Sequence, residues 1–261
     1  MPCRVNKKAE WKGRILLEDQ FSDKPSSFLT LTLNDDHYPA DGSLDKEIPR
    51  AFLNRLRYYS KESEKNRYFT VGEYGEQSTK RAHFHMALFG HPPDEYEKIF
   101  KKCWKVDGEE LGHIKTGELT PGSANYIAGY CTKKMTSKGD IRLDGRQPEF
   151  ATMSQRPCIG FAGFKNMVEI YKTRTGSAAL DKLKDISPLY RIQGCSYVIP
   201  PYWQKWMREQ LGIVNPPDRQ EGRYDDPFLF ELEQIDAIRR HNKLFHQAKR
   251  NDSGLKGVRT L

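Results

Sequence analysis

The chain has 261 residues, enough to bury a full core and to form one large domain or one domain with an appendage. A net charge of +8, together with 13 Tyr, 13 Phe and 4 Trp, favours a polyanionic partner, because cations meet phosphates and aromatic rings stack on bases. Five widely spaced cysteines argue against a disulfide framework and a zinc knuckle. No apolar run approaches ~20 residues and the N-terminal stretch is charged, which argues against a membrane span and a signal peptide. We therefore expect a cytosolic protein.

The first part of the chain predicts an arm, a strand and a helix. Residues 1–25 are polar and basic without a clear period, which predicts an N-terminal arm that is ordered only where it packs on the body or on DNA. Residues 28–33 alternate leucine with threonine and predict a half-buried strand. Residues 48–60 carry an apolar stripe at helical spacing, with Pro49 in the first turn, and predict a helix.

A hairpin, a helix and a strand are predicted next. Two strands within residues 67–90 are joined by a polar loop, and residues 94–103 predict a helix that Asp94 can cap. Residues 112–118 predict a short strand. The order β-α-β-β-α-β is the ferredoxin-like pattern, so the fold class is α+β with a ferredoxin-like, RRM-like antiparallel sheet in which the hairpin strands are central.

The remaining elements have weaker signals. Pro121 and Ser123 are predicted to open a helix that includes residues 123–134 and lies across the sheet, and residues 150–163 are predicted to form a structured loop. Residues 162–172 and 202–211 predict helices, residues 190–201 a strand pair. The predicted organisation is an arm (1–25), a main domain (26–165), a mainly helical extension packed on it (166–215), and a linker with a basic helical tail (216–261).

One strand carries two histidines that share a face. His83 and His85 flank Phe84, and residues two apart on a strand point to the same side. Two neutral imidazoles on one rigid strand provide two ligands of a metal site. Glu73 on the partner strand of the hairpin is the predicted third ligand, and Glu76 and His113 are the alternatives. A ligand set of two nitrogens and one oxygen suits manganese, or magnesium by availability.

The predicted helix that includes residues 123–134 carries two tyrosines on one face. Tyr126 and Tyr130 are four residues apart, and Lys133 follows Tyr130 by three residues on nearly the same side. Gly129 occupies the corresponding place after Tyr126. A tyrosine nucleophile keeps the energy of a cleaved phosphodiester in a covalent link, and a neighbouring lysine can stabilise the developing phenolate. The covalent link stores the energy for later rejoining, so no ATP is needed, and the absence of a Gly-x-x-x-x-Gly-Lys-Ser/Thr loop agrees with this.

These motifs resemble those of the HUH endonucleases, which nick single-stranded DNA and start rolling-circle replication. The matching segments are the strand Phe28-Leu29-Thr30-Leu31-Thr32, the His-hydrophobic-His motif His83-Phe84-His85 and the Tyr-x-x-Lys motif Tyr130-Cys131-Thr132-Lys133. The paired tyrosines, with Gly72-Glu73-Tyr74-Gly75 and Met153-Ser154-Gln155-Arg156-Pro157, look more specifically like the replication initiators of microviruses of the gokushovirus-like branch. The resemblance covers residues 26–165 well.

The resemblance implies a metal-dependent, site-specific nicking and joining enzyme. Tyr126, Tyr130 and Lys133 would be catalytic, a Mn2+ or Mg2+ ion would be the cofactor, and the product would be a 5′-phosphotyrosine with a free 3′-OH primer. Arg81, Lys134 and Arg156 are predicted to contact single-stranded origin DNA, and no small-molecule substrate or membrane is expected. A host helicase and polymerase would be the partners in the host cytoplasm. Another HUH transesterase, such as a relaxase or transposase, and a non-catalytic single-strand-binding module are the alternatives.

Overall fold

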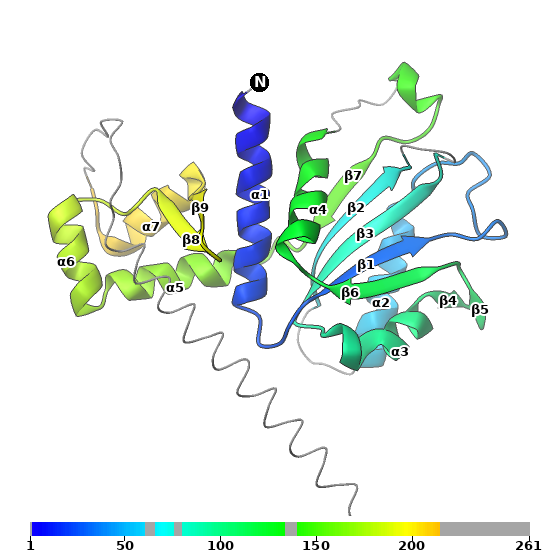
Figure 1. Cartoon of the computed structure of the whole chain (residues 1–261), viewed down its shortest axis with the longest axis horizontal. Helices are drawn as coiled ribbons and strands as arrows, with labels where there is room; N and C mark the ends of the chain where they lie inside the picture. The colour runs from blue at the N-terminus through cyan, green and yellow to red at the C-terminus, as the bar shows by residue number, and fades with distance from the viewer. Residues whose placement is uncertain (1, 61–65, 76–79, 134–139, 215–261) are drawn as a thin grey trace, which may run out of the picture. The chain divides into compact units, whose positions relative to one another are not determined.

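A computed structural model describes residues 2–60, 66–75, 80–133 and 140–214. The chain divides into two compact units, Met1–Gly163 and Phe164–Leu261. In the first unit, the described strands form a five-stranded antiparallel sheet in the order β6-β1-β3-β2-β7 (Figure 1). Their bounds are β1 (Ser27–Thr32), β2 (Arg67–Tyr74), β3 (Ala82–Phe89), β6 (Ile114–Glu118) and β7 (Phe150–Met153).

The predicted α+β class and the central position of the histidine strand are confirmed. Strand β3 is the middle strand of the sheet, between β1 and β2. Two helices, α2 (Glu47–Ser60) and α3 (Pro93–Cys103), cover one face. Their apolar stripes and one face of β1 and β3 form a continuous core, whose fully buried members include Leu29, Leu31, Phe52, Phe84, Met86, Phe100 and Trp104. The opposite face of the same strands carries the histidines, because strand residues alternate between faces.

Two helices lie on the histidine face. The tyrosine helix α4 (Pro121–Lys133) contacts β2, β3 and β7, and α1 (Pro2–Gln20) packs along it (Figure 1). Ile15, Leu16 and Leu17 of α1 are buried. The buried Glu18 pairs with Arg67 and accepts a 2.6 Å hydrogen bond from the amide of Gly160.

The N-terminal segment is therefore a packed helix where the sequence predicts an arm without a period. Its main apolar cluster, residues 15–17, is consecutive, and charged residues surround its other apolar positions, so the sequence has no clear helical period. Its anchors, Arg67 and Gly160, lie far along the chain, and packing against such distant segments supplies most helical stability in proteins.

Two short elements also differ from the sequence prediction. The predicted loop over residues 150–163 begins with β7, which adds to the edge of the sheet by pairing with β2. Helix α3 has Pro92 rather than Asp94 as its N-cap residue, and no side chain caps it. Two further small elements of the first unit are the hairpin of β4 (Lys105–Val106) with β5 (Glu109–Glu110) and the 3-10 turn Ile141–Leu143.

The second unit confirms the predicted helices and strand pair. It contains α5 (Phe161–Tyr171), which begins just before the unit boundary, the hairpin of β8 (Leu189–Ile192) with β9 (Cys195–Val198), and α7 (Pro201–Leu211). Helix α6 (Arg174–Leu183) is an addition. Phe164, Tyr190 and Trp203 form an aromatic core. The predicted linker and basic tail lie outside the described residues. Within the described part of the chain, no helix combines the length and the apolar character needed to cross a membrane.

Candidate metal centre and tyrosine pair

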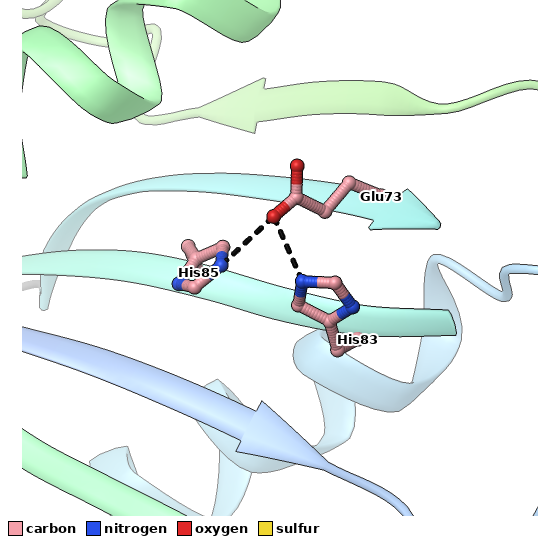
Figure 2. A group of neighbouring side chains, drawn as sticks. All are labelled: Glu73, His83 and His85. Carbon is pink, nitrogen blue, oxygen red and sulfur yellow. Dashed lines mark hydrogen bonds and ion pairs between the residues drawn. The ribbon is translucent and has the colours of Figure 1, made fainter. Parts of the chain in front are cut away.

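The hairpin register places Glu73 directly beside the histidines. Glu73 on β2 pairs with His83 on β3, and Val71 pairs with His85, so the three functional side chains share one face (Figure 2). Gly72, which precedes Glu73, points to the other face, where a Cβ would lie 2.7 Å from the ring of Phe150 on β7. A glycine at this position therefore allows the ring of Phe150 to pack directly against the backbone of the strand that carries Glu73.

One carboxylate oxygen is shared by both imidazoles. Nε2 of His83 lies 2.8 Å and Nε2 of His85 lies 2.9 Å from Oε1 of Glu73 (Figure 2). The three candidate ligand atoms all lie within 4.8 Å of one another. Glu73 is only 2% exposed, and His85 is buried. The geometry matches the predicted ligand set, with Glu73 as its carboxylate.

The other ring nitrogens are held by fixed partners. Nδ1 of His83 lies 3.1 Å from the carbonyl oxygen of Arg81, and Nδ1 of His85 lies 3.0 Å from Oγ1 of Thr30. A carbonyl oxygen only accepts, so Nδ1 of His83 donates and the lone pair of Nε2 faces Glu73. A second proton or a cation must then lie between this nitrogen and the carboxylate. Partners of this kind orient histidine ligands in metal sites.

The buried polar atoms fit a divalent cation. Among the described residues, Oε2 of Glu73 and Nε2 of His85 are buried without a hydrogen-bond partner, although Nε2 of His85 lies 2.9 Å from Oε1 of Glu73. Buried polar atoms normally have partners. A metal ion bound by Glu73, His83 and His85 would satisfy them, and three protein ligands leave positions open for a substrate.

The tyrosines reach this centre from α4. The hydroxyl of Tyr126 donates a 2.7 Å hydrogen bond to Oε1 of Glu73, and the hydroxyl of Tyr130 donates a 3.0 Å hydrogen bond to that of Tyr126. The ring of Tyr126 stands edge-on to that of His85, with centroids 5.0 Å apart. Tyr126 is 43% exposed, so part of its side chain faces solvent. The spacing of four residues thus places both hydroxyls on the metal side of α4.

The electrostatics of the site follow from this network. Burial raises the pKa of Glu73, but the interactions with His83, His85, Tyr130 and Tyr126 outweigh it and hold the pKa well below its usual range. The carboxylate is therefore ionised. Burial raises the pKa of Tyr130 above its usual range, and the bonds with Glu73 and Tyr126 add to the effect. In this arrangement Tyr130 is a neutral phenol.

The other predicted site residues have varied positions. Arg81 pairs with Asp35 at 2.6 Å and lies over the ring of Tyr38, while Arg156 is exposed. His113 lies beside β6, where its carbonyl oxygen accepts bonds from Thr32. Lys133 ends α4, but its side chain, and the whole of Glu76 and Lys134, lie outside the described residues. Sequence reasoning missed Thr30, although its alternation with leucines on β1 already placed it on a polar face.

Comparisons with known proteins give consistent results. Residues 26–135 match the family model described as replication-associated protein ORF2/G2P. The chain is 30% identical to the replication-associated protein VP4 of Bdellovibrio phage phiMH2K, over 80% of this chain and 66% of that protein. It is 31% identical to the replication-associated protein ORF2 of Spiroplasma virus 4, over 69% of this chain and 60% of that protein.

A third relative is the replication-associated protein ORF4 of Chlamydia phage 1, 31% identical over 46% of this chain and 33% of that protein. The chain thus spans about two thirds or less of the length of the curated relatives it matches. No solved structure matches it significantly. The family model and the three relatives lead to one conclusion: the chain belongs to the replication-associated protein ORF2/G2P family.

Proposed function

We propose that the protein starts rolling-circle replication of a phage genome by nicking, and later rejoining, single-stranded DNA at a specific site. One observation carries the proposal: two tyrosyl hydroxyls are linked by hydrogen bonds to the carboxylate of a two-histidine, one-carboxylate group. The curated relatives, named as replication-associated proteins of phages and a related virus, support the assignment to replication.

The proposed reaction is a transesterification at phosphorus. The phenolic oxygen of Tyr126 or Tyr130 forms a bond to the phosphorus, and the bond from phosphorus to the 3′ oxygen breaks. The phenol loses its proton and the leaving 3′ oxygen gains one, so the products are a 5′-phosphotyrosine and a 3′-OH that can prime synthesis. Mn2+ or Mg2+ held by Glu73, His83 and His85 would supply Lewis-acid polarisation of the phosphate oxygens.

Two tyrosines on one helix face allow the enzyme to alternate between them. While one tyrosine holds the 5′ end, the other can attack the site regenerated after a round of synthesis. The released 3′-OH then attacks the first phosphotyrosine and closes a circle. No nucleoside triphosphate is consumed, because the covalent link conserves the energy of the cleaved bond. The adjacency of the two hydroxyls, 3.0 Å apart, supports a shared reaction centre.

The part of the histidine face near β1 offers a surface for the DNA strand. Phe28, Thr30 and Thr32 of β1 are half-exposed on this face, and Lys115 of β6 pairs with Thr30 on the next strand. The ring of Phe28 stacks parallel to that of His85 with centroids 5.5 Å apart. This row of groups, which comprises an aromatic ring, hydroxyls and an ammonium group, suits single-stranded DNA, because bases stack on aromatic rings and phosphates bind cations.

The proposed setting follows from the chemistry. A chain without a nucleotide-binding loop would depend on a host helicase to unwind DNA and on a host polymerase to extend the 3′-OH, in the host cytoplasm. Its DNA contacts would include Arg156, which is exposed, and Lys134. Arg81 is a weaker candidate than its sequence position indicates, because Asp35 and Tyr38 already engage its guanidinium group.

A denaturing gel tests the proposal. The protein is incubated with Mn2+ and labelled single-stranded oligonucleotides that tile the genome encoding it. We expect a covalent protein–DNA adduct on one oligonucleotide, lost with EDTA and in the Tyr126→Phe/Tyr130→Phe double variant. Tyr58→Phe, which alters an exposed tyrosine on α2, is the matched control and should form the adduct normally. Metal-independent binding without an adduct on any oligonucleotide would instead identify a binding module.

A further inference from the structure

The two tyrosines differ in their sequence surroundings on α4. Tyr130 is followed three residues later by Lys133, whereas Tyr126 is followed three residues later by Gly129. On a helix, Gly129 therefore stands in the same relation to Tyr126 as Lys133 does to Tyr130. A nucleophile that lacks a cation at this place would lack the charge expected to stabilise its phenolate and the attacked phosphate.

The structure brings a lysine from another helix to this place. Lys8 of α1 extends over Gly129: its Cε lies 3.5 Å and its Nζ 3.7 Å from the point where a Cβ on Gly129 would begin. Both distances are ordinary van der Waals contacts. Gly129 is buried under α1, and the absence of a side chain there allows the lysine to lie against the backbone of α4.

The surroundings of Lys8 leave its charge available. Lys8 is half-buried and has no ion-pair partner among the residues that the structure describes, whereas the nearby Glu10 pairs with Arg14 at 3.6 Å. Helix α1 holds the position of Lys8 because its other end is anchored by Ile15, Leu17 and Glu18. An anchored, partly desolvated ammonium against the helix that carries Tyr126 attracts an anion more strongly than one in open solvent.

We propose that Lys8 supplies Tyr126 with the cation that position 129 lacks, by contacting the phosphate that Tyr126 attacks. The inference rests on the proposed nicking function and extends it to the N-terminal helix. Each tyrosine then has its own lysine, Lys133 from the same helix for Tyr130 and Lys8 from α1 for Tyr126. Both tyrosines are competent nucleophiles, which alternation between them requires.

Single-tyrosine variants separate the two nucleophiles. Adduct formation is measured in Tyr130→Phe, where only Tyr126 can attack, and in Tyr126→Phe, where only Tyr130 can. We expect Lys8→Ala to slow adduct formation by Tyr126 roughly tenfold or more, the range for losing a hydrogen bond to a charged group, and to slow that by Tyr130 much less. Lys7→Ala, which removes an exposed charge from the same helix, is the matched control and should leave both rates unchanged.

Two rescue variants distinguish a charge from a packing role. Lys8→Arg should keep most of the activity of Tyr126. In the Lys8→Ala background, Gly129→Lys should restore it by placing an ammonium on α4 itself. Apart from the neighbours of Gly129 and the backbone of α4, only Lys8 among the described residues lies within 4 Å of a Cβ at that position. A purely structural contact between the helices would not be restored in this way. The thermal unfolding midpoint of each variant checks that the fold is kept.

Three outcomes would overturn the inference. Equal losses in both single-tyrosine backgrounds would indicate a general effect on DNA binding or on the packing of α1. A Tyr130→Phe protein that forms no adduct even with Lys8 present would mean that Tyr126 is not a nucleophile. An absence of adduct in the unmodified protein would remove the proposed function itself, and that result is distinct from a loss confined to the Lys8 variants.

Discussion

At the scale of single residues, the site is built around one carboxylate oxygen. Oε1 of Glu73 contacts both imidazoles and accepts a hydrogen bond from Tyr126. The same group is therefore a candidate metal ligand and the hydrogen-bond acceptor that holds Tyr126 at the centre. Any change at Glu73 should alter metal binding, tyrosine position and acid sensitivity together.

The acid sensitivity of Glu73 leads to a first prediction. Its pKa is lowered in the folded protein, so its ionisation stabilises the fold at pH values above the unfolded pKa of about 4.3, and that stabilisation is lost as the pH falls toward the folded pKa. Glu73→Gln should lower the free energy of unfolding by about 1–3 kcal/mol at pH 7, the cost of disrupting a buried hydrogen-bond network. Below pH ~4.3 the difference from wild type should shrink.

Urea denaturation in metal-free buffer with EDTA, at several pH values, measures this difference. A gap between wild type and Glu73→Gln that widens as the pH falls would contradict the prediction, since it would require a raised pKa for Glu73 in the folded state.

The contact between Thr30 and His85 leads to a second prediction. Thr30→Val removes the hydroxyl next to Nδ1 of His85 while keeping the shape of the side chain. Loss of such a supporting partner typically weakens metal binding by about 10–100-fold. Calorimetric titration with Mn2+ measures the change. Thr32→Val is the matched control on the same face of β1, because the Thr32 hydroxyl bonds the carbonyl oxygen of His113 instead; an equal loss in both variants would exclude a specific role for Thr30.

At the scale of elements, β1 serves both layers of the first unit. Its leucines enter the core under α2 and α3, and its other face presents Phe28, Thr30 and Thr32 beside the histidines. Helix α4 lies on the neighbouring part of this face and α1 packs on α4. Because these helices cover only part of the histidine face, the polar and aromatic side chains of β1 stay half-exposed next to the candidate metal centre.

This surface leads to a third prediction. Phe28→Ala should weaken binding of single-stranded DNA by about 1–3 kcal/mol, the value of stacking one base on an aromatic ring. Fluorescence anisotropy with a labelled oligonucleotide measures it, in EDTA so that metal binding does not contribute. Tyr58→Ala removes an exposed ring from α2, on the other side of the sheet, and should have no effect. Similar losses in both variants would indicate that stacking on β1 is not part of the DNA contact.

At the scale of the whole molecule, the excess of cations is the dominant long-range property. The net charge is +8, and the proposed phosphate contacts draw on lysines and arginines from several elements. A positive protein attracts a nucleic acid before any specific contact forms, and the counterions released on binding make the affinity depend on salt.

The charge leads to a fourth prediction. Each phosphate contact to single-stranded DNA contributes a slope of about −0.7 in a plot of log affinity against log salt concentration, so three to five contacts predict a slope of roughly −2 to −4. Anisotropy titrations of the Tyr126→Phe/Tyr130→Phe double variant at about 50–300 mM NaCl measure the slope without covalent capture. A slope near zero would be incompatible with binding along a phosphate backbone.

The sequence by itself determined the parts of the site that depend on local periodicity. His83 and His85 share a face because strand residues alternate, and Tyr126 and Tyr130 share a face because helix residues recur after about four positions. The hairpin that brings Glu73 to the histidines is also local, since only a short loop separates its strands. These features needed no knowledge of how distant segments pack.

Only the tertiary structure decided what lies over and behind that site. Three contacts join residues about 50 to 120 positions apart in the chain. They are the hydrogen bond between Thr30 and His85, the hydrogen bond from Tyr126 to Glu73, and the contact of Lys8 with Gly129. No period in the sequence encodes such contacts, because they result from packing one complete element against another. Helix α1 is the clearest case: charged residues interrupt its apolar positions, so the sequence has no clear helical period, and its place beside α4 is set by the segments it packs against.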